Sequence, residues 1–146
     1  AVPLYYVILP MDLSDTDTYG TTITLSGFNS YGGYTYSGSA VTPTYTVTAN
    51  GNTLVSGTDY TASLTNNNTP GIATLTITGK GNYYRSVSKT FTLYGDISKA
   101  SIAVDTQYYT GSAINPDITV TCFGKTLAQN THFTKAVSSG GVTWDL

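Results

Sequence analysis

Residues 34–61 read YTYSGSAVTPTYTVTANGNTLVSGTDYT, and residues 107–134 read QYYTGSAINPDITVTCFGKTLAQNTHFT. Aligned without gaps, the two segments share 13 identical residues. In the first segment these are Tyr36, Gly38, Ser39, Ala40, Pro43, Thr46, Val47, Thr48, Gly51, Thr53, Leu54, Thr58 and Thr61. Self-similarity at a fixed spacing is typical of an array in which each unit packs beside neighbours of its own kind. The repeat therefore predicts a protein built from consecutive copies of one module.

Strict alternation of polar and apolar residues dominates the chain. Tyr45, Val47 and Ala49 are separated by single threonines, and residues 73–78 alternate in the same way. This period of two is typical of strands that bury one face, and turns rich in Asn and Gly separate the runs. No window has a helical period, so we expect an all-β protein. The expected strands are residues 21–26, 34–36, 44–49, 53–55, 59–65, 72–78 and 85–93.

Seven short strands are the number found in a β-sandwich of immunoglobulin size. The second copy opens at Asp96, and before Leu146 it has no counterpart of residues 72–77 or 87–93. We therefore expect one complete immunoglobulin-like module over residues 21–95 and an incomplete second module of the same type over residues 96–146. Residues 1–20 are expected to form an N-terminal strand followed by an acidic linker.

Four segments, residues 34–43, 57–61, 68–79 and 81–83, resemble the tandem immunoglobulin-like repeats of Gram-positive bacterial surface proteins. The resemblance implies a non-catalytic spacer, an adhesin stalk or a companion of carbohydrate-binding modules, located outside the cell or on its surface. The partners that it implies are neighbouring repeats, and a polysaccharide or a host surface is a further candidate. Such repeats share no catalytic motif, so the matching residues are expected to determine the fold.

Composition agrees with an extracellular protein and excludes several partners. Only 10% of the residues are charged, there is no Glu, and 13 residues are Tyr. The net charge of −2 and six scattered Lys and Arg leave no basic stripe, so we expect no nucleic-acid partner. The apolar run at residues 4–9 is far shorter than the roughly 20 residues that a membrane span needs, and it suggests a mature N-terminus.

The residues available for catalysis are few, and we expect no enzymatic activity. The chain has one His and one Cys, and it lacks a Gly-x-Ser-x-Gly motif and a phosphate-binding loop. A pair of Cys122 with His132 is conceivable. Because Cys122 aligns with Ala49 on an inward-facing strand position, a buried and inert thiol is the better interpretation.

Asp12, Asp15 and Asp17 place carboxylates at alternate positions ahead of Gly20. Oxygen ligands at this spacing form part of the pattern that calcium needs, although no Glu follows to close the shell. An acidic linker is the alternative, and no other cofactor is expected.

Lys89 shares its strand face with Val87, Phe91 and Leu93, so an unbroken strand would direct its ammonium toward the core. A bulge or an extended side chain that reaches solvent at an edge would explain this position. The alternative is an intramolecular amide bond between Lys89 and an asparagine, assisted by Asp59, which requires a buried and neutral lysine.

Tyrosine-rich surfaces also suggest sugar binding, since planar rings stack on pyranose faces. The candidates are the aromatic residues predicted outside the core, namely Tyr31, Tyr34, Tyr83, Tyr84, Tyr108 and Trp144. A carbohydrate-binding module is therefore an alternative function. Tyr is also common in strands, so the same residues could simply cover a sandwich.

The N-terminal run has the composition of a strand without a sheet. It is apolar on both faces, lies between Pro3 and Pro10, and comprises Leu4, Tyr5, Tyr6, Val7, Ile8 and Leu9. An incomplete module exposes an edge that recruits another strand. The run could complete the second module within one chain, join identical subunits into a fibre by donor-strand complementation, or belong to a preceding module of a longer array.

Overall fold

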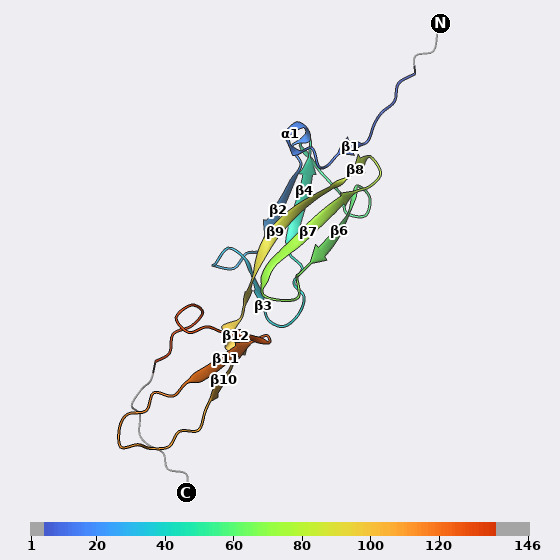
Figure 1. The fold of residues 1–146 in the computed structure, drawn as a ribbon. Helices are drawn as coiled ribbons and strands as arrows, with labels where there is room; N and C mark the ends of the chain where they lie inside the picture. Colours follow the sequence, from blue (N-terminus) through green and yellow to red (C-terminus); the bar gives the residue numbers. More distant parts are fainter. Residues whose placement is uncertain (1–4, 137–146) are drawn as a thin grey trace. The chain divides into compact units, whose positions relative to one another are not determined.

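The structure is a computed structural model that describes residues 5–136, and the chain divides after Gly95 into two compact units (Figure 1). Strands make up nearly all of the regular structure in both units, which confirms the expected all-β class. The helical segments among residues 5–136 are the four-residue α1 (Thr16–Tyr19) and the 3-10 turn η1 (Ile97–Lys99). Neither is long enough to cross a membrane.

The first unit holds three sheets. A three-stranded sheet has the order β2-β4-β5, a four-stranded sheet has the order β3-β9-β7-β6, and β1 pairs with β8. The strands of this unit are β1 (Met11–Asp12), β2 (Thr22–Ser26), β3 (Tyr34–Tyr36), β4 (Thr44–Ala49), β5 (Asn52–Thr53), β6 (Tyr60–Thr65), β7 (Gly71–Gly79), β8 (Tyr83–Tyr84) and β9 (Ser86–Gly95). All seven strands predicted here are present, and each end lies within two residues of its predicted position.

Two rows of apolar side chains form the core of this unit. The β2-β4-β5 sheet contributes Ile23, Val47 and Ala49, all buried. The larger sheet contributes Leu75 and Ile77 of β7 and Phe91 and Leu93 of β9, together with Ala73, and all of these are buried as well. The alternation in the sequence produces this result because successive side chains of a strand point to opposite faces.

Threonine and serine occupy the opposite faces and pair across the strands. The hydroxyls of Thr22 and Thr48 lie 2.6 Å apart, and those of Thr78 and Ser86 lie 2.9 Å apart. Cross-strand hydroxyl pairs of this kind stabilise sheets modestly while they leave the surface polar and uncharged. The low charge and high Thr content of the chain therefore have a structural explanation.

Residues 11–20 belong to the first unit and are not the linker that we expected from the sequence. Leu13 is fully buried, and its backbone N–H donates to the Tyr84 carbonyl at 3.0 Å. Asp15 accepts a hydrogen bond from the Thr18 N–H at 3.0 Å and thereby caps α1, which ends at Gly20 with φ of 56°. A cap residue at the start and a glycine at the end are the usual signals for such a turn, but four residues are too few to show a helical period.

The second unit repeats one sheet of the first. Its strands, β10 (Ser101–Val104), β11 (Ile118–Cys122) and β12 (Lys125–Leu127), have the order β10-β11-β12. Ile102 pairs with Val120, as Ile23 pairs with Val47 in the first unit. The turn at Asn50, with φ of 49°, and at Gly51, with φ of 74°, recurs at Phe123 with 48° and Gly124 with 74°. The repeat in the sequence thus encodes a repeated backbone.

The larger sheet has no counterpart in the second unit within residues 96–136. Residues 107–109 align with β3 but form no strand, and in the first unit β3 depends on pairing with β9. As a result Tyr109 is 70% exposed, whereas its equivalent Tyr36 is 8% exposed. Ile102 is 67% exposed, whereas Ile23 is 8% exposed. The apolar face of this sheet is therefore open on the β10 side, whereas Val120 and Cys122 of β11 on the same face are buried.

Candidate functional site

The most exposed apolar feature of the first unit is the segment Tyr5–Leu9, which we call the N-terminal segment. Its five side chains are between 78% and 87% exposed, and it belongs to no strand. A contiguous apolar surface of this kind usually marks a binding site. Leu4, the remaining residue of the predicted donor strand, lies outside the described residues.

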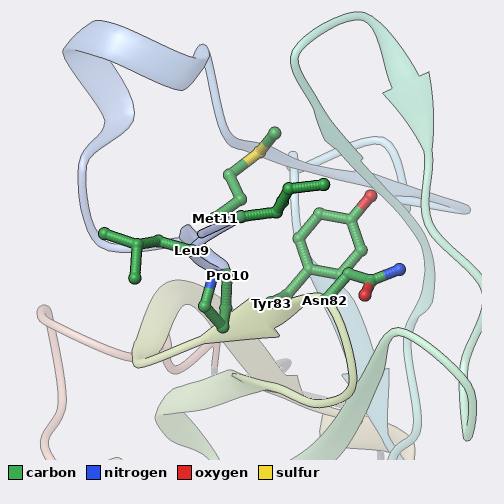
Figure 2. Close-up of a pocket in the computed structure, with 6 residues that line it drawn as sticks. Leu9, Pro10, Met11, Asn82 and Tyr83 are labelled. Carbon is green, nitrogen blue, oxygen red and sulfur yellow. The ribbon is translucent and has the colours of Figure 1, made fainter. Parts of the chain in front are cut away.

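The C-terminal end of this segment is anchored on the first unit. The Met11 N–H donates to the Asn82 carbonyl at 2.8 Å, and β1 then pairs in parallel with β8. Figure 2 shows Leu9, Pro10 and Met11 beside Asn82 and Tyr83, which together with Ile8 line an open groove of about 420 Å³. The anchor fixes where the chain enters the unit and leaves Tyr5–Leu9 exposed to solvent.

Gly79 allows the β8 turn to lie against the end of β7. A Cβ atom at this position would lie 2.6 Å from the Tyr84 nitrogen and 2.7 Å from the Tyr83 carbonyl carbon, closer than atoms of this kind approach. The close approach places Tyr84 where its carbonyl accepts from Leu13. A glycine between a strand and its following turn thus positions the anchor.

Asp12 holds the anchor electrostatically. Its carboxylate accepts from the Ser14 hydroxyl at 2.7 Å and from the Ser14 N–H at 2.9 Å, and it pairs with Arg85 at 3.0 Å. Hydrogen bonding to Ser14, with a smaller contribution from the Arg85 charge, lowers the pKa of Asp12 below its usual value. Partial burial and the nearby Asp12 charge raise the pKa of Tyr84, whose ring lies under the Arg85 guanidinium.

We expect acid to weaken both units through two carboxylates. The pKa of Asp96 is also lowered, mainly by hydrogen bonding to Ser98. A carboxyl whose folded pKa lies below its unfolded value of about 3.9 contributes stability above that value and loses it as the pH falls through the folded pKa. Urea unfolding at pH 6 and pH 3 should therefore show a smaller acid loss in the Asp12→Asn/Asp96→Asn variant. The exposed Asp105→Asn variant is the control, and it should retain the full acid loss.

The structure places two of the aromatic candidates for sugar binding next to each other. Tyr83 and Tyr84 are neighbours on β8, Tyr108 belongs to the second unit, and Trp144 lies outside the described residues. Tyr34 is buried and belongs to the core. Its hydroxyl donates to the Ser26 carbonyl at 2.6 Å, and burial raises its pKa.

One exposed aromatic pair involves a residue that the sequence did not single out. The rings of Tyr31 and Tyr94 are 5.9 Å apart, and the Tyr94 hydroxyl donates to the Tyr31 carbonyl at 3.3 Å. Tyr94 follows the buried Leu93 on β9, so its outward orientation agrees with the strand period. Only the fold brings Tyr31, in the loop before β3, against it.

The three predicted calcium ligands have separate roles. Asp12 binds Ser14 and Arg85, and Asp15 caps α1. Asp17 lies in the first turn of α1, where a carboxylate favours the helix dipole. Within residues 5–136, no three His, Cys, Asp or Glu side chains are grouped so that they could hold a metal ion.

Lys89 and Asp59 are not placed for an amide bond. Lys89 is exposed, so the burial that would neutralise its ammonium is missing. It lies opposite Leu75 in the β7–β9 register and lines a pocket that also includes Thr21 and Val87. Asp59 instead accepts from the Val55 N–H at 2.7 Å, and no hydrogen bond or ion pair in the described chain joins it to Lys89.

His132 has the same role as Asp59 in the repeat and does not pair with Cys122. Its Nδ1 accepts from the Ala128 N–H at 2.9 Å, and Val55 and Ala128 are equivalent positions. Cys122 is buried, with Sγ 3.5 Å from the Asp96 carbonyl oxygen. The histidine is therefore a turn residue.

We expect His132→Asp to retain the stability of the second unit, because the carboxylate can accept from Ala128 as Asp59 accepts from Val55. His132→Ala should lower the free energy of unfolding by about 1 kcal/mol, the typical net value of one hydrogen bond. Hydrogen exchange of the turn after β12, residues 128–133, measures both. Equal losses in the two variants would show that this bond does not stabilise the turn.

Comparisons with protein-family models, with curated proteins and with solved structures found no match for this chain. The described residues instead bring together two features with clear physical consequences. One is an anchored, exposed apolar segment, and the other is a repeated sheet whose edge strand β10 exposes Ile102 and Val104. Both are suited to protein–protein contact through strands.

Proposed function

We propose that the chain is a non-catalytic structural or adhesive repeat of a bacterial surface protein and that its units are immunoglobulin-like β-sandwiches. The recurrence of the β2-β4-β5 sheet as β10-β11-β12 carries this proposal. The two sheets share their pairing register and the dihedral angles of their turn. A backbone that recurs along one chain is the property expected of a spacer or stalk built from like units.

The strand pairing of the first unit supports a role under tension. β3 pairs in parallel with β9, with Tyr34 opposite Leu93 and Tyr36 opposite Gly95. β1 pairs in parallel with β8 in the same way. Pulling on the chain ends therefore loads first β1 against β8 and then β3 against β9, and each time draws the two strands in opposite directions along their length. All of the hydrogen bonds between them are then loaded together and cannot open one at a time. This arrangement resists extension better than a hairpin pulled apart at its open end.

The surface of the unit also suits a spacer. Hydroxyl pairs such as Thr76 with Ser88, 3.0 Å apart, line the exposed faces. The salt bridge of Asp12 with Arg85 is the one ion pair within residues 5–136. A neutral, hydroxyl-rich surface stays hydrated without attracting charged partners, which is useful outside a cell.

Single-molecule pulling of the full chain by its two ends tests the proposal. The first unit should extend in one abrupt step. The length released is about 300 Å, the extended length of the roughly 85 residues from Met11 to Gly95, less the distance between the ends of the folded unit. Gradual extension at low force would contradict a mechanical role. Saturable retention on an insoluble polysaccharide would favour the carbohydrate-binding alternative, and the loss of that retention in Tyr83→Ala/Tyr84→Ala would locate the site.

A further inference from the structure

We propose that the N-terminal segment, Tyr5–Leu9, is a closing strand of the β9 type, that is, the last strand of a unit, and that it docks in another copy of this chain on the open β10 side of the second unit's sheet. The inference rests on the proposed function, since it requires the units to share one fold. The exposed segment of one copy and the open face of another copy are then partners. Repeated docking would join copies head to tail.

The first argument is the turn that follows each strand. β9 is followed by Asp96, Ile97 and Ser98, and the N-terminal segment is followed, after Pro10 and Met11, by Asp12, Leu13 and Ser14. The Asp96 carboxylate accepts from the Ser98 N–H at 3.0 Å, and the Asp12 carboxylate accepts from the Ser14 N–H at 2.9 Å.

The backbone of the two turns agrees as well. The Asp96 carbonyl accepts from the Lys99 N–H at 3.0 Å, and the Asp12 carbonyl accepts from the Asp15 N–H at 3.3 Å. One junction structure therefore occurs twice. What precedes Asp96 is a closing strand, so the residues before Asp12 stand in the position of a closing strand.

The second argument is the pattern of the segment. Counted back from the aspartate of each junction, Leu9 matches Leu93, and Val7 matches Phe91. Phe91 and Leu93 are 5% and 2% exposed, whereas Val7 and Leu9 are 83% and 78% exposed. The segment thus carries the core-facing residues of a closing strand but has no core beneath them. Its other face, Tyr6 and Ile8, matches the outward-facing Thr90 and Thr92.

The third argument is the surface that lacks such a strand. In the first unit β9 pairs with β3 and belongs to the sheet whose apolar face forms the core with β2 and β4. In the second unit the equivalent of β3 is exposed at Tyr109, and Ile102 and Val104 of β10 are 67% and 55% exposed. A β9-type strand offers both the backbone and the apolar side chains that this face lacks.

Docking on another copy reproduces between two chains the junction that occurs within one. Only Pro10 and Met11 separate Leu9 from Asp12, as only Tyr94 and Gly95 separate Leu93 from Asp96. A segment that closes the second unit of another copy is therefore followed directly by a first unit, just as β9 is followed directly by the second unit. Such docking depends on protein concentration, whereas docking within one chain does not.

Light scattering during size exclusion of the full chain over a range of concentrations tests the proposal. The molar mass should rise with concentration above the 15.4 kDa of one chain. Val7→Asp/Leu9→Asp should abolish the rise. Tyr6→Thr/Ile8→Thr is the matched control, because it removes as much apolar surface from the outward face and introduces the residues found at Thr90 and Thr92, so association should persist.

A mixing experiment tests the acceptor. Ile102→Asp should fold, because Ile102 is exposed, and it should remain monomeric alone. Val104→Asp, at a second exposed position, replaces it if the first variant loses its circular dichroism signal. Mixed with Val7→Asp/Leu9→Asp, it should form dimers only, because each mixture holds one intact donor and one intact acceptor. A wild-type chain that stays monomeric would overturn the docking. The proposed function would still stand if the first unit unfolds in one step in the pulling experiment. Equal loss of association in Val7→Asp/Leu9→Asp and in Tyr6→Thr/Ile8→Thr would also overturn the docking and would indicate unspecific apolar adhesion.

Discussion

Replacing Leu75 with alanine should lower the free energy of unfolding of the first unit by about 2–5 kcal/mol, the range for truncation of a buried leucine. Leu75 is 1% exposed and lies at the centre of β7, between β6 and β9. Truncation would leave a cavity that solvent cannot fill. The core residues Val47 and Ile77 cannot move to fill it, because their own strands hold them. Since whole domains are stable by only about 5–15 kcal/mol, the variant should unfold at much lower urea concentration.

Leu64→Ala provides the matched control for this prediction. Leu64 faces Leu75 across the β6–β7 pair, but it is only half-buried on the edge strand. Its truncation should cost clearly less than that of Leu75, since solvent and neighbouring side chains can occupy the space. Urea unfolding followed by circular dichroism compares the two variants. A loss below about 1 kcal/mol for Leu75→Ala would show that the two sheets do not share a packed core.

Truncation of two equivalent isoleucines should give very different results. Ile23→Ala should destabilise the first unit by about 2–5 kcal/mol, because Ile23 is 8% exposed and packs in the core. Ile102→Ala should change the second unit by no more than about 0.5 kcal/mol, because Ile102 is 67% exposed. Hydrogen exchange of β2 and β10 in each variant measures both effects within one chain.

Protein concentration is the control for the isoleucine pair. If copies of the chain dock head to tail, Ile102 becomes covered, so the comparison is made at the lowest measurable concentration and in the Val7→Asp/Leu9→Asp background. Ile102→Ala should then be neutral in that background and costly only where copies associate. Equal costs at Ile23 and Ile102 in the monomer would contradict an open second sheet.

The sequence by itself determined the strands, the turns and the repeat. Alternation of Tyr45, Val47 and Ala49 with threonine is a local property, and the two faces of a strand follow from it without knowledge of any partner. The Asn50-Gly51 turn is equally local, since both residues tolerate positive φ. Very short elements such as β1 and β8 escaped prediction because two residues show no period.

Only the tertiary structure decided which apolar faces are covered. Ile23 and Ile102 occupy equivalent strand positions and pair with equivalent valines, yet one is buried and the other exposed. Burial of Ile23 depends on a second layer supplied by distant strands, and β7 and β9 supply that layer only in the first unit among the described residues. In the same way, Leu13 was assigned to a linker because its burial under the β8 turn depends on contacts more than sixty residues away. Local patterns specify a strand and its two faces, whereas long-range contacts determine which face is covered.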